Sequence, residues 1–187
     1  MFEPPDVDDR PAERVAELVA QLGTDAVVRW CAGLLAAETA YDDPALPSLS
    51  WLGGPAAPWL LDQVEPQRSV NAYWARVWAG RGLLHVYTPT AARHIVDALG
   101  DDAWRVREMA AKVVARWEVA DAADDLVALV RDEVTRVRAA AVRALGVVGE
   151  GEHAEVVRAA EGDPESTVRR AAAVAIAALQ RRLDREL

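Results

Sequence analysis

The chain has 187 residues, of which 52% are hydrophobic and only 6% aromatic, and its net charge is −9. This length is enough for one domain with an adequate apolar core. The acidic balance disfavours nonspecific nucleic-acid binding, because such binding depends on neutralising phosphates. The single cysteine, Cys31, excludes an intrachain disulfide and is typical of a reducing compartment.

Acidic residues concentrate in the first 50 positions, which hold ten acidic and three basic residues. Residues 1–10 predict a solvated acidic tail, and an acidic arm that docks a basic partner is the alternative. No apolar stretch follows a basic region near the N-terminus, and no apolar run approaches about 18 residues. The sequence therefore predicts a soluble cytoplasmic protein that makes no membrane contact.

Residues 11–57 predict an N-terminal helical cap followed by a loop. The segment Pro11–Leu22 favours a helix, because a proline stands at its start and Gly23 follows its end. A second helix is expected from about 24 to 39. The stretch 41–58 is rich in Pro, Asp, Ser and Gly, so a long ordered loop is expected there rather than a helix.

One motif recurs three times at a spacing of 31 residues: Asp, four residues, Val-Arg, two residues, Ala. A fixed period of this size is the signature of a repeat architecture. Each Val-Arg opens a stretch with apolar residues at helical spacing. A degenerate fourth copy around Ala75, Arg76 and Ala79 lacks the Asp. The three full copies begin at Asp101, Asp132 and Asp163 and carry Val106-Arg107, Val137-Arg138 and Val168-Arg169.

Each 31-residue unit is expected to form two antiparallel helices joined by short turns. In the last full copy, Asp163 suits the N-cap of the second helix and Pro164 its first turn. Single units cannot bury their apolar faces alone, so the stacked array is the folding unit. We therefore expect one all-α domain, 1–187, built as a right-handed α-α superhelix. Its four units are expected at about 58–90, 91–121, 122–152 and 153–187.

On these residues the chain resembles HEAT-repeat proteins, in particular the short HEAT-like repeats of phycobilisome lyase subunits. The resemblance implies an α-solenoid in which the Asp and the Arg six residues later form a ladder of hydrogen bonds between successive repeats. It also implies a non-enzymatic protein-interaction or scaffold module whose partner is an unidentified protein or peptide. The matching ladder residues are Asp101, Arg107, Asp132, Arg138, Asp163 and Arg169.

Two alternative functions remain open. One is a lyase- or chaperone-like factor that acts on a modified protein, and it rests only on the shared repeat. The other is an enzyme similar to the HEAT-like alkylpurine DNA glycosylases. The acidic charge, the shorter chain and the lack of a clear basic groove count against the second alternative.

Aromatic residues give the best local clue to a binding surface. Trp74 and Trp104 occupy positions that are polar in the later repeats, where a solvent-facing side chain is expected. Either the N-terminal segment covers these rings or they form an exposed patch. The candidate partner-binding residues are Tyr73, Trp74, Arg76, Trp104 and Arg105. Trp78, in contrast, occupies a packing position.

No catalytic motif is present, so no catalytic residue and no cofactor is predicted. His94 and Asp97 share a helix face, but two ligands do not make a metal site, and no metal is predicted. Cys31 lies at a packing position of its helix rather than an activated one. The C-terminal helix, about 163–185, ends in polar residues as a solenoid terminus requires, and a homodimer contact there is the alternative.

Overall fold

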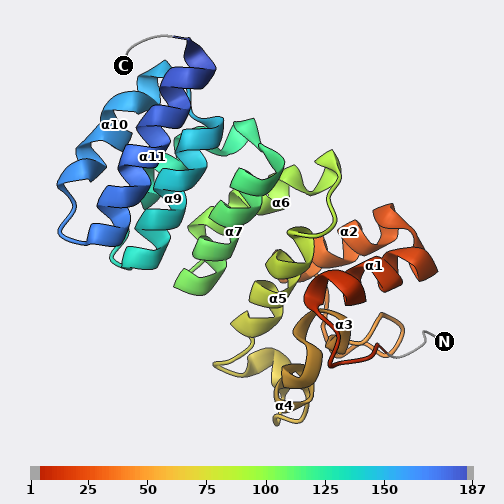
Figure 1. Ribbon diagram of the computed structural model, residues 1–187. Helices are drawn as coiled ribbons and strands as arrows, with labels where there is room; N and C mark the ends of the chain where they lie inside the picture. Colours follow the sequence, from red (N-terminus) through yellow and green to blue (C-terminus); the bar gives the residue numbers. More distant parts are fainter. Residues whose placement is uncertain (1–4, 185–187) are drawn as a thin grey trace. The chain divides into compact units, whose positions relative to one another are not determined.

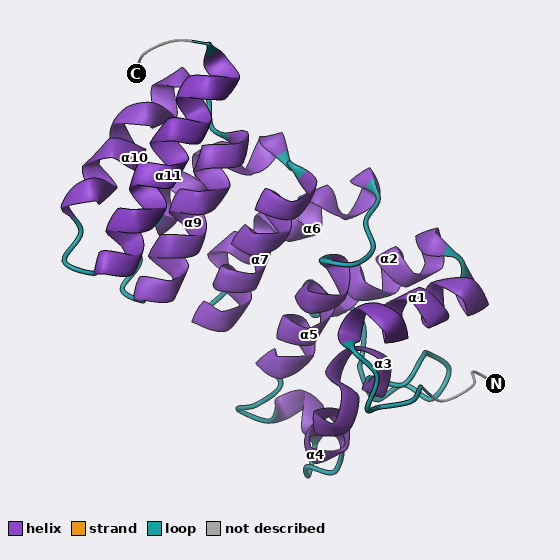
Figure 2. Cartoon of the chain, viewed as in Figure 1, coloured by secondary structure: helices purple, strands orange, loops and turns teal. Residues whose placement is uncertain are grey.

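The computed structural model describes residues 5–184, and in this part of the chain every regular element is a helix (Figure 2). The all-α prediction is confirmed. The chain divides into two compact units, 1–95 and 96–187, which are described in turn. The α-helices are α1 (Pro11–Leu22), α2 (Thr24–Leu35), α3 (Ser50–Gly53), α4 (Ala57–Leu61), α5 (Tyr73–Leu83), α6 (Ala92–Asp97), α7 (Trp104–Trp117), α8 (Ala123–Leu129), α9 (Thr135–Val148), α10 (Ala154–Ala159) and α11 (Ser166–Leu183).

The first unit begins with the helical hairpin of α1 and α2. Helix α1 has the predicted bounds, with proline in its first turn and Gly23 after its end at φ 83°. Helix α2 ends at Leu35, so the predicted extension to about residue 39 is wrong. The chain turns there because Ala37 takes a left-handed conformation, and the carbonyl of Gly33 accepts hydrogen bonds from the next two amides.

The stretch predicted as a loop, 41–58, contains the short helix α3 and the start of α4, so that prediction is wrong in part. Trp51 and Leu52 of α3 are fully buried. Helix α3 packs against α1 and α5, and α2 also packs against α5. Burial of two large apolar side chains therefore outweighs the turn preference of the surrounding Gly and Pro residues.

Arg14 of α1 is a buried cation, only 3% exposed. Its Nε donates to the carbonyl oxygen of Trp51 (3.2 Å), and Nη1 donates to the carbonyls of Val7 (3.1 Å) and Asp9. Burial lowers the pKa of Arg14, and the charge of nearby Arg81 lowers it further. The guanidinium thus joins α1 to α3 and to the segment that precedes α1.

Replacing Arg14 by Met is expected to lower the free energy of unfolding by about 2–3 kcal/mol, because three carbonyl groups lose their shared donor. Urea unfolding followed by tryptophan fluorescence measures the change. Arg29→Met is the matched control, since Arg29 is an exposed arginine on the neighbouring helix. Equal midpoints for the two variants would contradict the structural role of Arg14.

In the second unit, α9 lies between α7 and α11 and packs against both (Figure 1). Helix α8 packs against α9, and α10 packs against α11. The apolar residues of the repeated motif have no exposed surface, which places them in the core between the helices. These residues are Val106, Ala110, Val137, Ala141, Val168 and Ala172.

The last of the second helices starts later than predicted. Helix α11 begins at Ser166 with Glu165 at its N-cap, so the placement of Asp163 at the N-cap is wrong. The Asp163 carboxylate instead accepts a hydrogen bond from the Glu165 amide (2.8 Å). Asp101 and Asp132 accept in the same way from the amides two residues on (2.7 and 2.8 Å). The motif Asp therefore closes the turn before the helix rather than capping it.

Helices α9 and α11 are in close contact at a glycine. A Cβ atom added at Gly146 would lie 2.7 Å from both Cα and Cβ of Ala175, too near for normal contact. Glycine at 146 and alanine at 175 therefore set the distance between the two helices.

Candidate interaction surface

Helices α7, α9 and α11 carry most of the positive charge of the second unit. At 100° per residue, Arg105, Lys112 and Arg116 share the side of α7 opposite to its buried stripe. Arg136 and Arg143 occupy the equivalent positions of α9. On α11 these positions hold Thr167, Val174 and Ala178, and the exposed cations Arg170 and Arg181 lie at other positions of that helix. We name these side chains the basic face; its members are Arg105, Lys112, Arg116, Arg136, Arg143, Arg170 and Arg181.

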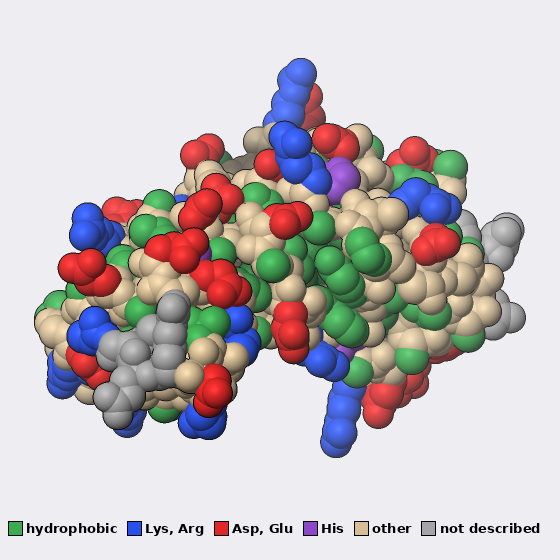
Figure 3. All heavy atoms as spheres, turned by 90° about the horizontal axis from the view of Figure 1, so that it is seen from above, with side chains coloured by type: hydrophobic (Ala, Val, Ile, Leu, Met, Phe, Trp, Pro, Cys, Tyr) green, Lys and Arg blue, Asp and Glu red, His purple; other side chains and the backbone are tan. Residues whose placement is uncertain are grey.

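Charge is segregated within each repeat of this unit. Helices α7, α9 and α11 together contain eleven Arg or Lys residues and a single acidic residue, Glu108. The intervening segments 118–134 and 149–165 contain twelve acidic residues and two arginines. Figure 3 shows acidic side chains gathered into groups on the face that it presents. The basic face is thus strongly positive although the whole chain is negative.

Trp104, the first residue of α7, contacts two cations of the basic face. Its ring is half-buried and has the guanidinium carbon of Arg105 at 4.2 Å and that of Arg136 at 5.6 Å. Both distances fall within the range of cation–π attraction. The aromatic ring therefore links α7 to α9 and restrains two of the cations.

Glu108, like Trp104, restrains two cations of the basic face. It is only 7% exposed, and its Oε1 accepts from Lys112 Nζ (2.7 Å) and from Arg136 Nε (3.2 Å). One carboxylate thus serves an i, i+4 partner on its own helix and a partner on α9. The local balance of Glu108, Arg105, Lys112 and Arg136 remains positive by two charges.

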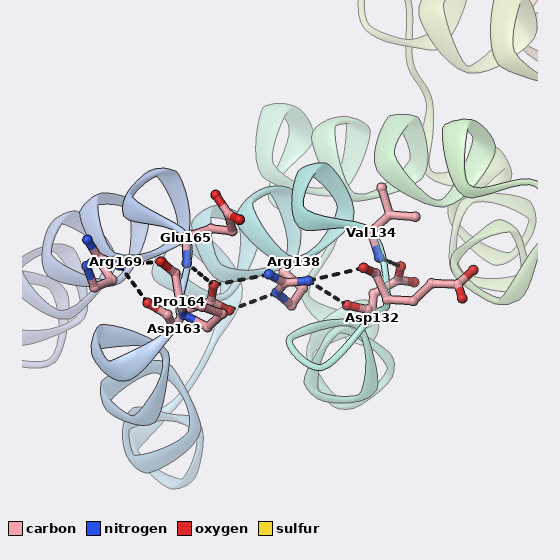
Figure 4. A network of polar contacts seen from close by, with 8 residues as sticks. Asp132, Val134, Arg138, Asp163, Pro164, Glu165 and Arg169 are labelled. Carbon is pink, nitrogen blue, oxygen red and sulfur yellow. Dashed lines mark hydrogen bonds and ion pairs between the residues drawn. The ribbon is translucent and has the colours of Figure 1, made fainter.

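The predicted ladder residues form a series of contacts along the repeats, and Figure 4 shows the part from Asp132 to Arg169. Arg107 Nε donates to Asp132 of the next repeat (2.7 Å). Arg138 donates to both carboxylate oxygens of Asp163, from Nε (2.8 Å) and Nη2 (3.1 Å). The ion pairs therefore join the Arg of one repeat to the Asp of the following one.

Within each copy the Asp and the Arg six residues later interact differently. Arg138 Nη1 donates to the backbone carbonyls of Asp132 (3.0 Å) and Glu133 (3.3 Å). Arg107 and Arg169 make the corresponding bonds to the turns at Asp101 and Asp163. Hydrogen bonding from Arg138 holds the pKa of Asp163 below its ordinary value, and opposes the effect of burial. These residues serve packing between repeats.

The other sequence-predicted residues lie in the first unit. Tyr73 and Trp74 stack with ring centroids 5.3 Å apart, and Trp74 lies 6.0 Å from Trp78. Trp78 is buried, and Gly53 of α3 leaves room for its ring. Tyr73, Trp74 and Arg76 are half-buried on α5. The structure therefore groups the aromatic residues of α5 with one another and, through Trp78, with the N-terminal segment.

Trp104 and Arg105 belong to the second unit, whereas Tyr73, Trp74 and Arg76 belong to the first. Sequence reasoning missed the members of the basic face on α9 and α11, which are Arg136, Arg143, Arg170 and Arg181. It summed charge over residues 51–187, where acidic and basic residues nearly cancel. Separating the two halves of each 31-residue period would have revealed the segregation.

No other feature of residues 5–184 indicates a ligand site, a metal site or a reactive side chain. A surface pocket of about 230 Å³ beside the Arg138–Asp163 pair is smaller than ordinary ligand sites. Within residues 5–184 no group of His, Cys, Asp and Glu could hold a metal ion. Cys31 is buried, and burial raises the pKa of its thiol to about 12.

Among the described helices none alone is long and apolar enough to cross a membrane; α1 and α2 pass that test only as a pair bent by 120°.

The paired helices and their ladder define a helical-repeat protein of the α-solenoid class. Residues 59–146, slightly less than half of the chain, match the family model of HEAT repeats. The match does not extend to the narrower resemblance to phycobilisome lyase subunits. HEAT repeats serve in general as scaffolds for protein interaction.

A comparison with curated proteins found no match. Among solved structures, the crystal structure of an engineered protein is similar, with 19% identity and a TM-score of 0.49. That match covers 91% of this chain and 80% of the engineered one.

Proposed function

We propose that the chain is a non-enzymatic interaction scaffold that binds a partner protein on the basic face of its second unit. The observation that carries this proposal is the segregation of eleven cationic residues and one carboxylate onto α7, α9 and α11. Charge separated in this way steers a partner of opposite sign and fixes its orientation. A role in packing alone accounts for the ladder arginines, but not for the exposed Arg143 and Arg170.

Trp104 strengthens the proposal. Tryptophan and arginine are the residue types that contribute most to binding energy at protein interfaces. Here Trp104, Arg105 and Arg136 lie together on neighbouring helices. Tyr73, Trp74 and Arg76 on α5 form a second candidate contact, because they combine two stacked rings with a cation. The single buried cysteine agrees with the reducing environment of the cytoplasm, where we place the protein.

Affinity capture from native lysate, quantified by mass spectrometry, tests this function. The variant Arg136→Gln/Arg143→Gln removes two exposed cations from the basic face. Its matched control is Arg131→Gln/Arg158→Gln, which makes the same change in net charge. It removes two exposed cations outside the basic face, one in the turn after α8 and one on α10. We expect a set of proteins that wild type and control retain and the face variant loses.

A third bait, Trp74→Ala, separates the two candidate contacts. Loss of the same proteins from this bait alone would move the binding site to α5. Identical captures by all baits would contradict a partner-binding role for either group. Circular dichroism of each variant verifies that the helices remain folded.

A further inference from the structure

We propose that the basic face recognises an acidic helical segment of its partner, with carboxylates seven residues apart on one side. The inference rests on the proposed function, because it names the chemistry of the protein that the scaffold binds. It draws on the sign, the spacing and the restraint of the cations on α7, α9 and α11.

The ligand is expected to be negatively charged, because the basic face keeps positive charges after its internal ion pairs are counted. Glu108 is the sole carboxylate in these three helices, and Lys112 and Arg136 already contact it. Arg143 and Arg170 are exposed, and each adds a charge that no carboxylate of α7, α9 or α11 offsets. A ligand for this face must therefore supply several negative charges of its own.

The spacing selects a helix. Arg105 and Lys112 on α7 are seven residues apart, as are Arg136 and Arg143 on α9. Seven residues of α-helix rise about 10.5 Å and return to almost the same side. A partner helix with carboxylates at every seventh residue presents the same spacing on one side. An extended peptide rises about 3.3 Å per residue, so carboxylates three residues apart would match the length but point to opposite sides.

The restraint of the cations favours binding. Arg105 and Arg136 are held against the Trp104 ring, and Lys112 and Arg136 are held by Glu108. Side chains that are already ordered lose less conformational entropy when a ligand arrives. Val174 of α11, 66% exposed, lies at the position equivalent to Lys112 and Arg143. An apolar side chain of the partner helix has a contact there.

Nucleic acid fits these observations less well. Acidic residues occupy the turns at both ends of the second helices, Asp132 and Glu133 before α9 and Glu150 and Glu152 after it. A long polyanion that crosses the face along the helices meets these carboxylates, whereas a short acidic helix ends before them. Stacking of bases needs an open aromatic ring, and the Trp104 ring already carries a guanidinium.

Fluorescence anisotropy with purified full-length protein tests the inference. The first probe is a labelled Ala/Gln-rich helical peptide with Glu at every seventh position. The second has the same composition with the Glu residues distributed around the helix. The third is a short DNA duplex. Each probe is titrated at low and at physiological ionic strength, because exposed ion pairs weaken with salt.

We expect the first peptide to bind about tenfold more tightly than the second, as alignment of a few exposed ion pairs gives. Arg136→Gln/Arg143→Gln is expected to remove about tenfold of this affinity, and Arg131→Gln/Arg158→Gln to leave it unchanged. Equal affinity for the two peptides would overturn the spacing. Tighter binding of the duplex than of either peptide would replace the protein partner by nucleic acid.

Two further outcomes also contradict the inference. Absence of peptide binding at low ionic strength excludes an acidic helix as the ligand. Concentration-dependent sedimentation of the protein alone, abolished by Arg136→Gln/Arg143→Gln, assigns the face to a second copy of this chain. In the first case, proteins lost from the face variant in the capture experiment would still support the scaffold function, so the two proposals fail separately.

Discussion

Replacing Gly146 by Ala is expected to destabilise the protein by about 2 kcal/mol, although alanine is the better helix former. Helix propensity alone favours this substitution by about 1 kcal/mol. The added Cβ would lie 2.7 Å from Cα and Cβ of Ala175, however, and backbone atoms of α11 cannot move independently. Overpacking costs about 1–3 kcal/mol, and a clash with backbone atoms belongs at the upper end of that range, so about 2 kcal/mol remains after the gain in propensity.

Urea denaturation followed by far-ultraviolet circular dichroism measures the effect. Gly162→Ala is the matched control, because nothing lies within 4 Å of a Cβ added there. We expect its midpoint to equal or slightly exceed that of wild type. A gain in stability for Gly146→Ala would show that the close approach of α9 and α11 does not limit the size of residue 146.

Replacing Arg138 by Met is expected to cost about 3 kcal/mol. The guanidinium donates twice to Asp163 and twice to the turn at Asp132, and the ion-paired side chains of Arg138 and Asp163 are 13% and 10% exposed. Removing one partner of a largely buried pair leaves the other charge without compensation. Arg143→Met, an exposed change on the same helix, is expected to change stability by less than about 0.5 kcal/mol.

The stability lost in Arg138→Met is expected to depend on pH and to be smaller in acid. The pKa of Asp163 lies below its ordinary value in the folded protein, so its ionised form stabilises the fold above the unfolded pKa. That contribution is lost as the pH falls through the folded pKa. The stability difference between wild type and Arg138→Met is therefore expected to shrink on acidification. A difference that stays constant from neutral to acidic pH would contradict the ion pair.

The motif at 31-residue spacing predicted much of the second unit. Three recurrences of Val-Arg placed α7, α9 and α11, and the apolar positions after them are buried. The N-cap was misplaced because Asp suits both a cap and the turn before a helix. Only the backbone distinguishes the two, and the structure places the Asp163 carboxylate on the amide two residues further on.

The first unit was harder to predict because its local and tertiary preferences conflict. Gly53, Gly54 and Pro55 indicate a turn, but Trp51 and Leu52 are buried beside α1 and α5 and fold into α3. No local pattern reveals that contact. Arg14 illustrates the same limit, since its acceptors are backbone carbonyls, which leave no trace in the sequence.

Part of the candidate site could be predicted from the sequence. Trp104 stood out because it breaks the pattern of its repeat, and Arg105 because it is a cation in the same unit as this aromatic residue. Arg136 did not, because an arginine at a polar helix position is unremarkable until Glu108 and Trp104 are found beside it. The basic face is a property of the arrangement of helices, and net charge over the whole array conceals it.

The burial of Cys31 has a practical consequence for measuring how the protein opens. The thiolate is the form that reacts, and the folded first unit both covers the sulfur and keeps it protonated. Residues 96–187 contain no other thiol. Labelling by a thiol reagent under native conditions therefore records only those openings that release α2. Its rate, compared with that of the unfolded chain, gives the free energy of local opening for the N-terminal unit alone.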